Sequence, residues 1–354
     1  MPVNIRPVRA AALALLVVLS AAACAPRYEP AGPATTAPRI ETASPLKIVA
    51  ADGATLPLRC WSPEGKPRAV FLGLHGFNDY SRAFETPGAF WAKRGIETCA
   101  YDQRGFGAGP HPKIWSDTAS MTGDARTAAT LLRARHPGIP FFVVGESMGG
   151  AVAMVAAADG GLSADGLVLV APALRGRRYL GAFPRASLWL FSRLVPALIL
   201  TGEGLRVQAS DNIPMLRALG ADPLVIKGAR IDTVRGLVDL MDAAIEAAPK
   251  LHVPALVLYG VRDELIPETP TIDAIRALPQ DTGHRAAIYR GGWHMLLRDL
   301  GADAVLADVL AWTANPKAPL PSGADREAAR MLAKAPESAA ESDRKEAPPR
   351  AQDH

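Results

Sequence analysis

The clearest candidate for chemistry in this 354-residue chain is a serine that stands between glycines. A short apolar stretch, 140–144, leads into Gly145-Glu146-Ser147-Met148-Gly149-Gly150, and an Ala-rich helical stretch follows at once. A strand, the pattern Gly-x-Ser-x-Gly and a helix are typical of a nucleophile elbow, whose sharp turn exposes the serine hydroxyl at a sheet edge. Any side chain at 145 or 149 would collide with the neighbouring strand and helix. The pattern therefore predicts a nucleophilic Ser147, and an ordinary turn is the alternative.

A second loop offers groups that could stabilise an oxyanion. His75-Gly76-Phe77 follows an apolar stretch, 69–74, that we expect to be a strand. The Met148 amide stands at the start of a helix, where N–H groups lack an intrahelical partner. We therefore expect the backbone amides of Phe77 and Met148 to form an oxyanion hole. His75 ends a buried strand, which favours a structural role for its ring over a catalytic one.

These two motifs, with Tyr101-Asp102-Gln103-Arg104-Gly105-Phe106-Gly107, resemble the α/β-hydrolase superfamily, and within it the monoacylglycerol lipase and lysophospholipase group of serine aminopeptidase-like hydrolases. The resemblance covers about 46–315. It implies a mostly parallel eight-stranded sheet with helices on both faces and a helical lid inserted after the sixth strand. It also implies buried hydrogen bonds for Asp102-Gln103-Arg104, and hydrolysis of lipid carboxylic esters without a cofactor.

A serine hydroxyl needs a general base that a carboxylate holds in place, and in this fold the three follow in the order Ser, Asp, His. Asp263 lies four residues past an expected strand at 255–259 and, with Pro267, matches the family pattern Gly-x-x-Asp-x-x-x-Pro. Glu264 is the alternative acid. His294 follows the last expected strand, where the family has its base, and the preceding glycines let that loop bend toward Ser147.

The remaining pattern predicts the scaffold for these loops. Short, fully apolar stretches alternate with helical ones, which indicates a mostly parallel sheet covered on both faces. The stretch 172–249 breaks this alternation, because it contains no clear buried strand, and we expect a lid over the carboxyl edge of the sheet. Its most apolar helix would line an acyl-chain channel or simply pack on the core, with four residues as candidates: Leu188, Trp189, Phe191 and Leu194.

The two ends of the chain differ from this core. Arg6 and Arg9 precede an apolar run that is too short to span a bilayer, and this indicates an export signal over 1–23. Ala21-Ala22-Ala23-Cys24 resembles a bacterial lipobox, so we expect lipidation of Cys24 and anchoring to a membrane of the bacterial envelope, with ordinary cleavage after Ala23 as the alternative. The full division comprises the signal (1–23), a lipid anchor and Pro-rich tether (24–45), the core (46–171 and 250–314), the lid (172–249) and a disordered tail (315–354). Within this tail, the stretch 324–335 is the one candidate for a transient helix.

Composition and charge exclude several classes. A net charge of +4 without a basic stripe argues against nucleic-acid binding. Three cysteines rule out a disulfide scaffold, and no His, Cys and carboxylate cluster has the spacing of a metal site. Cys60 and Cys99 fall on strands that the family fold usually places side by side; they could pair in an oxidising compartment, but two buried small hydrophobes are the favoured interpretation.

The predicted activity is therefore a serine hydrolase that cleaves esters of fatty acids, such as monoacylglycerols or lysophospholipids, through an acyl-enzyme on Ser147. Two alternatives remain. The same triad could cleave an amide or a thioester, or the chain could be a non-catalytic envelope lipoprotein that uses the fold only for binding.

Overall fold

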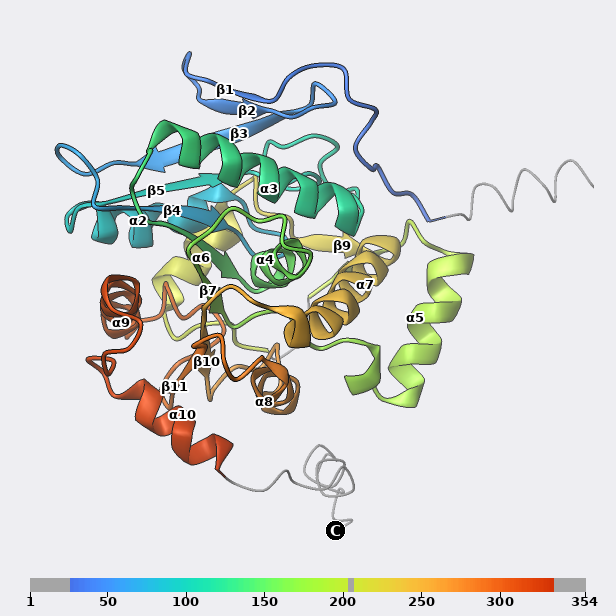
Figure 1. Ribbon diagram of the computed structural model, residues 1–354. Helices are drawn as coiled ribbons and strands as arrows, with labels where there is room; N and C mark the ends of the chain where they lie inside the picture. The colour runs from blue at the N-terminus through green and yellow to red at the C-terminus, as the bar shows by residue number, and fades with distance from the viewer. Residues whose placement is uncertain (1–25, 203–206, 334–354) are drawn as a thin grey trace, which may run out of the picture.

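The computed structural model describes residues 26–202 and 207–333 (Figure 1). The predicted signal and Cys24 lie outside these residues. Within them, no helix combines the length and the apolar character that a membrane span requires.

A nine-stranded sheet in the order β1-β2-β3-β5-β4-β6-β7-β10-β11 forms the centre of the molecule. The pairs β1–β2, β2–β3 and β3–β5 are antiparallel, whereas all pairs from β5 to β11 are parallel. The strands are β1 (Arg39–Glu41), β2 (Lys47–Val49), β3 (Thr55–Trp61), β4 (Ala69–Leu74), β5 (Ile96–Tyr101), β6 (Phe141–Glu146), β7 (Gly166–Val170), β10 (Ala255–Gly260) and β11 (Arg285–Tyr289).

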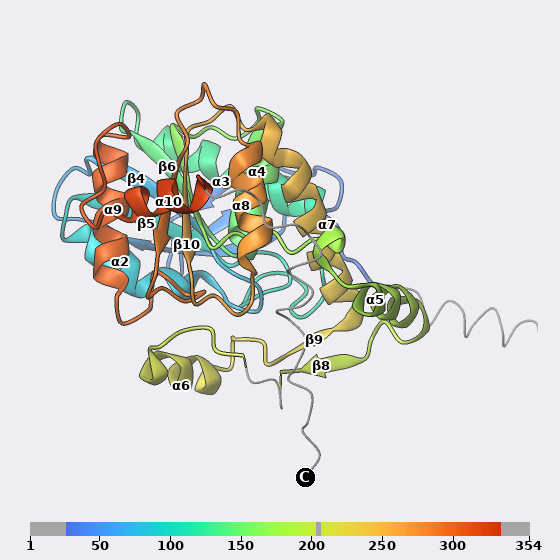
Figure 2. The ribbon, with the colours of Figure 1, turned by 90° about the horizontal axis from the view of Figure 1, so that it is seen from below.

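Helices cover both faces of this sheet (Figure 2). Strands β4, β5, β6, β7 and β10 are buried along their whole length, because apolar side chains on both faces meet helices. One apolar core contains side chains of α3, α4, α7 and α8, and the other contains those of α2 and α9. The helices are α2 (Glu85–Ala92), α3 (Thr118–Arg135), α4 (Met148–Ala158), α5 (Ala182–Leu194), α6 (Ile213–Ala221), α7 (Ile231–Ala247), α8 (Glu268–Ala277), α9 (Ala302–Ala314) and α10 (Ala324–Leu332), with 3-10 turns η1 (Ser81–Phe84), η2 (Arg177–Tyr179) and η3 (Ala248–Lys250).

The predicted α/β-hydrolase fold is confirmed, with one strand more than expected. The ninth strand is β1, which lies in the predicted tether and pairs with β2. The lid consequently follows the seventh strand rather than the sixth. Two short strands that the sequence pattern did not indicate, β8 (Ile199–Thr201) and β9 (Gly228–Arg230), pair within the lid.

The segment from 26 to 45 is not a free tether. The Arg27 amide donates to Asp232 Oδ2 (3.0 Å), and the Ala31 amide donates to Ser120 Oγ (2.7 Å). Tyr28 packs on the larger core, and its burial raises the pKa of the phenol to about 12. The Pro-rich composition led us to expect an extended spacer, and it carried no information on the surface that this segment covers.

The beginning of the predicted disordered tail is also ordered. Helix α10 packs along β11, the last strand of the sheet, and contributes Ala324 and Ala328 to the two cores. Glu327 pairs with Arg290 (2.7 Å), just after β11. A polar sequence therefore becomes ordered here, because the exposed side of an edge strand offers it contacts. Residues 334–354 lie outside the described part of the chain.

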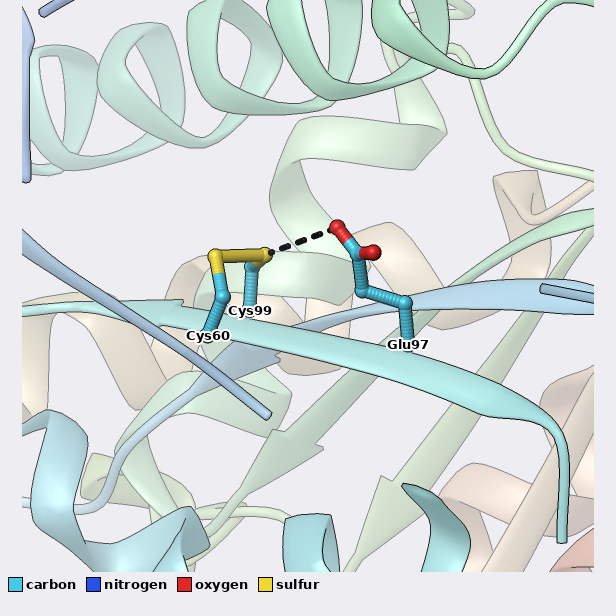
Figure 3. A group of neighbouring side chains, drawn as sticks. All are labelled: Cys60, Glu97 and Cys99. Atoms are coloured by element: carbon cyan, nitrogen blue, oxygen red, sulfur yellow. Dashed lines mark hydrogen bonds between the residues drawn. A yellow bond between two sulfur atoms is a disulfide. The ribbon is translucent and has the colours of Figure 1, made fainter. Parts of the chain in front are cut away.

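Cys60 and Cys99 form a disulfide between β3 and β5 (Figure 3). They are direct partners in the antiparallel register, with Cα atoms 4.1 Å apart. The favoured interpretation of two unpaired buried cysteines is therefore wrong. Glu97 lies beside them, with Oε1 3.7 Å from Cys99 Sγ. In the described residues this trio is the only cluster with donor atoms close enough for a metal, and the disulfide removes its two thiolates.

Candidate active site

Ser147 occupies a sharp turn between β6 and α4. Its backbone has φ 52° and ψ −114°, a strained conformation for a residue with a side chain, and its side chain is only partly buried. A Cβ at Gly145 would lie 2.4 Å from the Gly149 carbonyl oxygen, and one at Gly149 would lie 2.0 Å from the Leu74 carbonyl oxygen. These contacts explain both glycines, as the sequence pattern predicted for a nucleophile elbow.

The predicted oxyanion loop approaches this elbow closely. A Cβ on Gly76 would lie 3.5 Å from Ser147 Cβ, so the two backbones are in near contact. Within the described part of the chain, neither the Phe77 amide nor the Met148 amide donates a hydrogen bond. Both donors are therefore available to a group that enters beside Ser147.

His75 has the structural role that we expected. Its Nε2 accepts a hydrogen bond from the Gln103 amide (3.0 Å), so its Nδ1 donates to the Gly76 carbonyl (2.8 Å). Complete burial lowers the pKa of this imidazole and favours the neutral ring that these two bonds require. The ring thereby links the loop after β5 to the oxyanion loop.

Asp263 and His294 are joined at the carboxyl edge of the sheet. His294 Nδ1 lies 2.7 Å from Asp263 Oδ2, and both side chains are buried. The other carboxylate oxygen, Oδ1, accepts hydrogen bonds from the amides of Leu265 (2.8 Å) and Ile266 (2.9 Å). The carboxylate therefore has a fixed orientation and holds the imidazole through its Nδ1–H.

The loops that carry this pair contact each other directly. A Cβ on Gly260, at the end of β10, would lie 2.4 Å from the Gly292 carbonyl oxygen, which also accepts a hydrogen bond from the Arg262 amide (2.9 Å). Glu264 points elsewhere and accepts a hydrogen bond from the Gln208 amide of the lid (2.6 Å). The structure thus places Asp263, and not Glu264, on His294. No hydrogen bond joins the Ser147 hydroxyl to His294 in the described residues.

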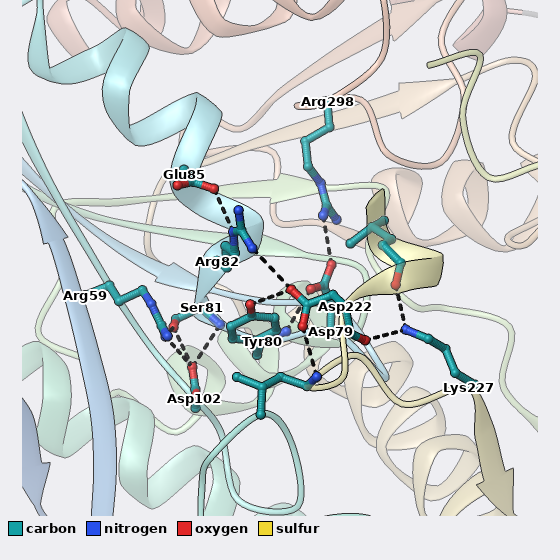
Figure 4. A network of polar contacts seen from close by, with 12 residues as sticks. Arg59, Asp79, Tyr80, Ser81, Arg82, Glu85, Asp102, Asp222, Lys227 and Arg298 are labelled. Atoms are coloured by element: carbon teal, nitrogen blue, oxygen red, sulfur yellow. Dashed lines mark hydrogen bonds and ion pairs between the residues drawn. The ribbon is translucent and has the colours of Figure 1, made fainter. Parts of the chain in front are cut away.

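Sequence reasoning did not single out a buried ion cluster beneath these loops. Arg298 Nη1 lies 2.8 Å from Asp79 Oδ2, and Arg298 Nη2 lies 2.9 Å from Glu146 Oε2 (Figure 4 shows the contact with Asp79). Burial raises the pKa of Glu146, an effect that the nearby Arg298 opposes. Only the adjacency of Glu146 to Ser147 could have pointed to this cluster.

The lid is attached to the same loops. The Met295 amide, next to His294, donates to the Ala209 carbonyl (3.0 Å), and the Ile226 amide donates to the Asn78 carbonyl (2.9 Å). Tyr80 Oη donates to Asp222 Oδ2 (2.7 Å), which also pairs with Arg82 (Figure 4). The lid therefore contacts the histidine loop at one end and the oxyanion loop at the other.

The four predicted acyl-channel residues are distributed unevenly. Leu188 and Trp189 line a cavity of about 610 Å³ between α5 and α7, which several arginines also line, and Trp189 is nevertheless 59% exposed. Phe191 and Leu194 are 45% and 54% exposed. Helix α5 stands away from the sheet (Figure 1) and packs on α7. The amphipathic pattern therefore identified the helix, but not the direction in which its apolar residues point.

Asp102-Gln103-Arg104 makes the buried hydrogen bonds that we expected. Asp102 Oδ1 accepts from the Ser81 amide (3.1 Å), and Oδ2 accepts from the Ala108 amide (2.9 Å). Arg104 pairs with Asp124 (2.6 Å) and Asp52 (2.7 Å). Gln103 joins this turn to the oxyanion loop through His75, whereas Arg104 ties the turn to α3 and to the loop after β2.

Comparisons with known proteins agree with this geometry. The family model "Serine aminopeptidase, S33" matches residues 65–301. Human monoglyceride lipase is 26% identical over 273 residues, which cover 76% of this chain and 89% of the human protein. A monoacylglycerol lipase of Mycolicibacterium smegmatis is 26% identical over 263 residues, covering 73% of this chain and 93% of its own.

Solved structures show the same fold. A monoacylglycerol lipase of Paleococcus ferrophilus superposes with a TM-score of 0.61 at 20% identity, over 73% of this chain and 98% of that chain. A carboxyl esterase of Bacillus coagulans superposes with a TM-score of 0.63 at 20% identity, over 78% and 98% of the two chains. With the elbow, the Asp–His pair and a family match over most of its length, this chain belongs to the serine aminopeptidase S33 family of α/β-hydrolases.

Proposed function

We propose that this protein is a serine hydrolase that cleaves carboxylic esters of lipids, of the monoacylglycerol or lysophospholipid type. The observation that carries the proposal is the 2.7 Å contact between Asp263 and His294 at the sheet edge where Ser147 stands on its strained turn. The names of the sequence relatives, which include several monoglyceride lipases, support the substrate class.

The proposed reaction begins with Ser147 Oγ. It attacks the ester carbonyl carbon while His294 Nε2 takes its proton, and Asp263 stabilises the imidazolium that forms. The serine–histidine hydrogen bond that this step requires would tighten when substrate binds, as apo sites often have longer catalytic contacts. The amides of Phe77 and Met148 receive the negative charge that develops on the carbonyl oxygen.

The tetrahedral intermediate then collapses. His294 returns the proton to the leaving alcohol, and the acyl group remains on Ser147 as an ester. Water attacks this acyl-enzyme with His294 again as the base, and the fatty acid leaves as Ser147 recovers its proton. Every step uses residues of this chain and water, so the proposal includes no cofactor.

Replacement of Ser147 tests the proposal directly. We expect Ser147→Ala to lower kcat on p-nitrophenyl butyrate by at least ~10³-fold while leaving the circular dichroism spectrum unchanged, because the nucleophile is lost and the fold is not. A fluorophosphonate probe should label the wild-type protein and not this variant. Activity within tenfold of wild type would rule out Ser147, and a wild-type protein that the probe never labels would favour a non-catalytic binding role.

Matched substrates test the bond that is cleaved. A panel with one acyl chain and an ester, thioester or amide leaving group should give the highest kcat/KM for the ester. Monoacylglycerol and lysophosphatidylcholine of the same chain length then separate the two lipid classes. A preference for the amide or thioester would overturn the ester assignment while leaving the triad in place.

We also propose that the protein is exported and anchored in the bacterial envelope through Cys24. The Cys60–Cys99 disulfide supports export, because such bonds persist in oxidising compartments and are rare in the cytosol. The intact mass of the protein recovered from membranes tests both parts. We expect a chain that starts at Cys24 with added acyl mass; cleavage without added mass would exclude the anchor, and an uncleaved chain would exclude export.

A further inference from the structure

We propose that Arg298 is a positioning residue for the hydrolysis, and that its guanidinium holds the histidine loop, the elbow and the oxyanion loop in one arrangement. This inference rests on the proposed function. It starts from contacts that link three separate parts of the chain: Arg298 with Asp79 at 2.8 Å and with Glu146 at 2.9 Å.

Each member of the cluster stands close in sequence to one proposed catalytic group. Asp79 lies two residues past Phe77, whose amide is a proposed oxyanion donor. Glu146 directly precedes Ser147, and Arg298 follows His294 by four residues. The Arg298 amide donates to the Met295 carbonyl (2.8 Å), so a tight turn joins the histidine to the arginine. One side chain therefore connects the loops that carry nucleophile, base and oxyanion donor.

The cluster is almost completely buried. The side chains of Arg298, Asp79 and Glu146 are 8%, 8% and 3% exposed. Removing charges from water is costly, and such clusters are often no more stable than well-packed apolar side chains. Stability is therefore a weak explanation for one guanidinium and two carboxylates beneath this site. A planar guanidinium with several donors, however, can hold two carboxylates at once: it donates a hydrogen bond to Glu146 Oε2 and forms an ion pair with Asp79, which an apolar side chain cannot do.

The opposite side of the histidine loop is held by different contacts. The Asn212 side-chain amide donates to the Arg298 carbonyl (2.9 Å), and Asp299 Oδ2 accepts from the Trp293 amide (2.8 Å). Ser210 Oγ donates to the other oxygen of Asp299 (2.6 Å). Asn212 and Ser210 belong to the lid, so these hydrogen bonds attach the histidine loop to the lid. The Arg298 side chain is the charged contact that attaches the same loop to the elbow.

The test compares Arg298→Lys and Arg298→Met with wild type on p-nitrophenyl butyrate. A lysine keeps the positive charge but lacks the planar guanidinium that can contact two carboxylates at once. A methionine keeps a similar size but leaves both carboxylates without a cation. Since a displacement of about 1 Å can cost about a hundredfold in rate, we expect kcat to fall about tenfold for Arg298→Lys and about a hundredfold for Arg298→Met, with KM within about threefold. The rate of fluorophosphonate labelling should fall in parallel, because it reports the attack by Ser147 itself.

Arg104→Lys is the matched control. Arg104 is equally buried and also pairs with two carboxylates, Asp52 and Asp124, but contacts none of the three loops directly. We expect this control to lower the melting temperature while keeping kcat within threefold of wild type. Glu146→Gln, which keeps its size and can still accept from Arg298, covers the case in which Arg298→Met does not fold; its kcat should fall less than that of Arg298→Lys.

The outcomes separate this inference from the proposed function. Wild-type protein without esterase activity would overturn the proposed function and the inference with it. An active wild type whose Arg298→Lys variant keeps kcat within twofold would overturn only the inference. An equal loss of kcat in Arg104→Lys would also overturn it, because that result would indicate a general effect of a damaged fold. A rise in KM with unchanged kcat would overturn it too, because that result would indicate an effect on substrate binding.

Discussion

Replacing Asp263 by asparagine should disable the histidine while preserving the loop. Asp263 Oδ1 accepts hydrogen bonds from two amides, those of Leu265 and Ile266, at 2.8 and 2.9 Å. In Asp263→Asn the carbonyl oxygen must take this position, because an NH₂ group there would face two donors. The NH₂ group is then directed at His294 Nδ1, 2.7 Å away in the wild-type protein.

This arrangement forces the wrong tautomer. Nδ1 would have to accept a hydrogen bond, so the ring proton would move to Nε2, and Nε2 could no longer take the proton of Ser147. The same substitution in serine proteases lowers kcat by about 10⁴-fold, which corresponds to about 5 kcal/mol in activation free energy at 1.36 kcal/mol per tenfold. We expect a loss of this size in kcat for p-nitrophenyl butyrate, with little change in melting temperature because both loop amides keep their acceptor.

Glu264→Gln is the matched control for this prediction. Glu264 is the adjacent carboxylate and accepts from the lid amide of Gln208 rather than from His294. Its variant should keep kcat within about threefold of wild type, since a neutral carbonyl can accept the same hydrogen bond. If Asp263→Asn retained activity within tenfold while Glu264→Gln lost it, the tautomer argument would be wrong and Glu264 would be the working acid.

Two further predictions concern stability. The double variant Cys60→Ser, Cys99→Ser should lower the free energy of unfolding by at most about 4 kcal/mol, which is the chain-entropy effect expected for a disulfide between residues 39 apart. Urea unfolding compares this variant with the wild-type protein, and the wild-type protein with and without reductant. Equal stability of the oxidised and the disulfide-free forms would refute the prediction. The pKa of Asp52 is lowered from 3.8 to about 2, chiefly by its hydrogen bond with Arg104, so its contribution to stability is complete above about pH 4 and declines as the pH falls toward 2. Asp52→Asn should therefore show a smaller loss of unfolding free energy between pH 5 and pH 3 than wild type, and an unchanged slope would contradict this assignment.

The parts of the site that could be predicted are those that contiguous residues encode. The elbow is such a part. The turn brings residue 149 against the Leu74 carbonyl, where a Cβ atom has no space, so the sequence must have a glycine at this position. Asp263 and His294 could be identified because each follows a strand, at the edge where the ends of parallel strands meet, and because both match positions that the family resemblance implies. Strand order and hydrophobic pattern thus carry most of the information about which backbones converge.

The rest depends on contacts that leave no local pattern. The residues around Arg298 do not indicate its partners, and its importance is visible only when Asp79 and Glu146, far away in the chain, are found at its guanidinium. Helix α10 and the segment around Tyr28 have compositions typical of disorder, yet both are ordered by surfaces that the core offers them. Composition reports what a segment can bury by itself, whereas these segments are stabilised by what they cover.

The sheet determines where the catalytic loops lie, whereas buried hydrogen bonds determine how their side chains are oriented. Single substitutions should therefore affect turnover and fold stability separately. The sheet places the loops: the register of β10 with β11 and with β7 determines where Asp263 and His294 begin. Buried polar contacts then orient the side chains, since two loop amides direct the Asp263 carboxylate and that carboxylate directs the imidazole. A variant that keeps the strands but reverses one donor, such as Asp263→Asn, should therefore retain its melting temperature and lose its turnover, whereas a variant that disturbs the packing of the strands should lose both together.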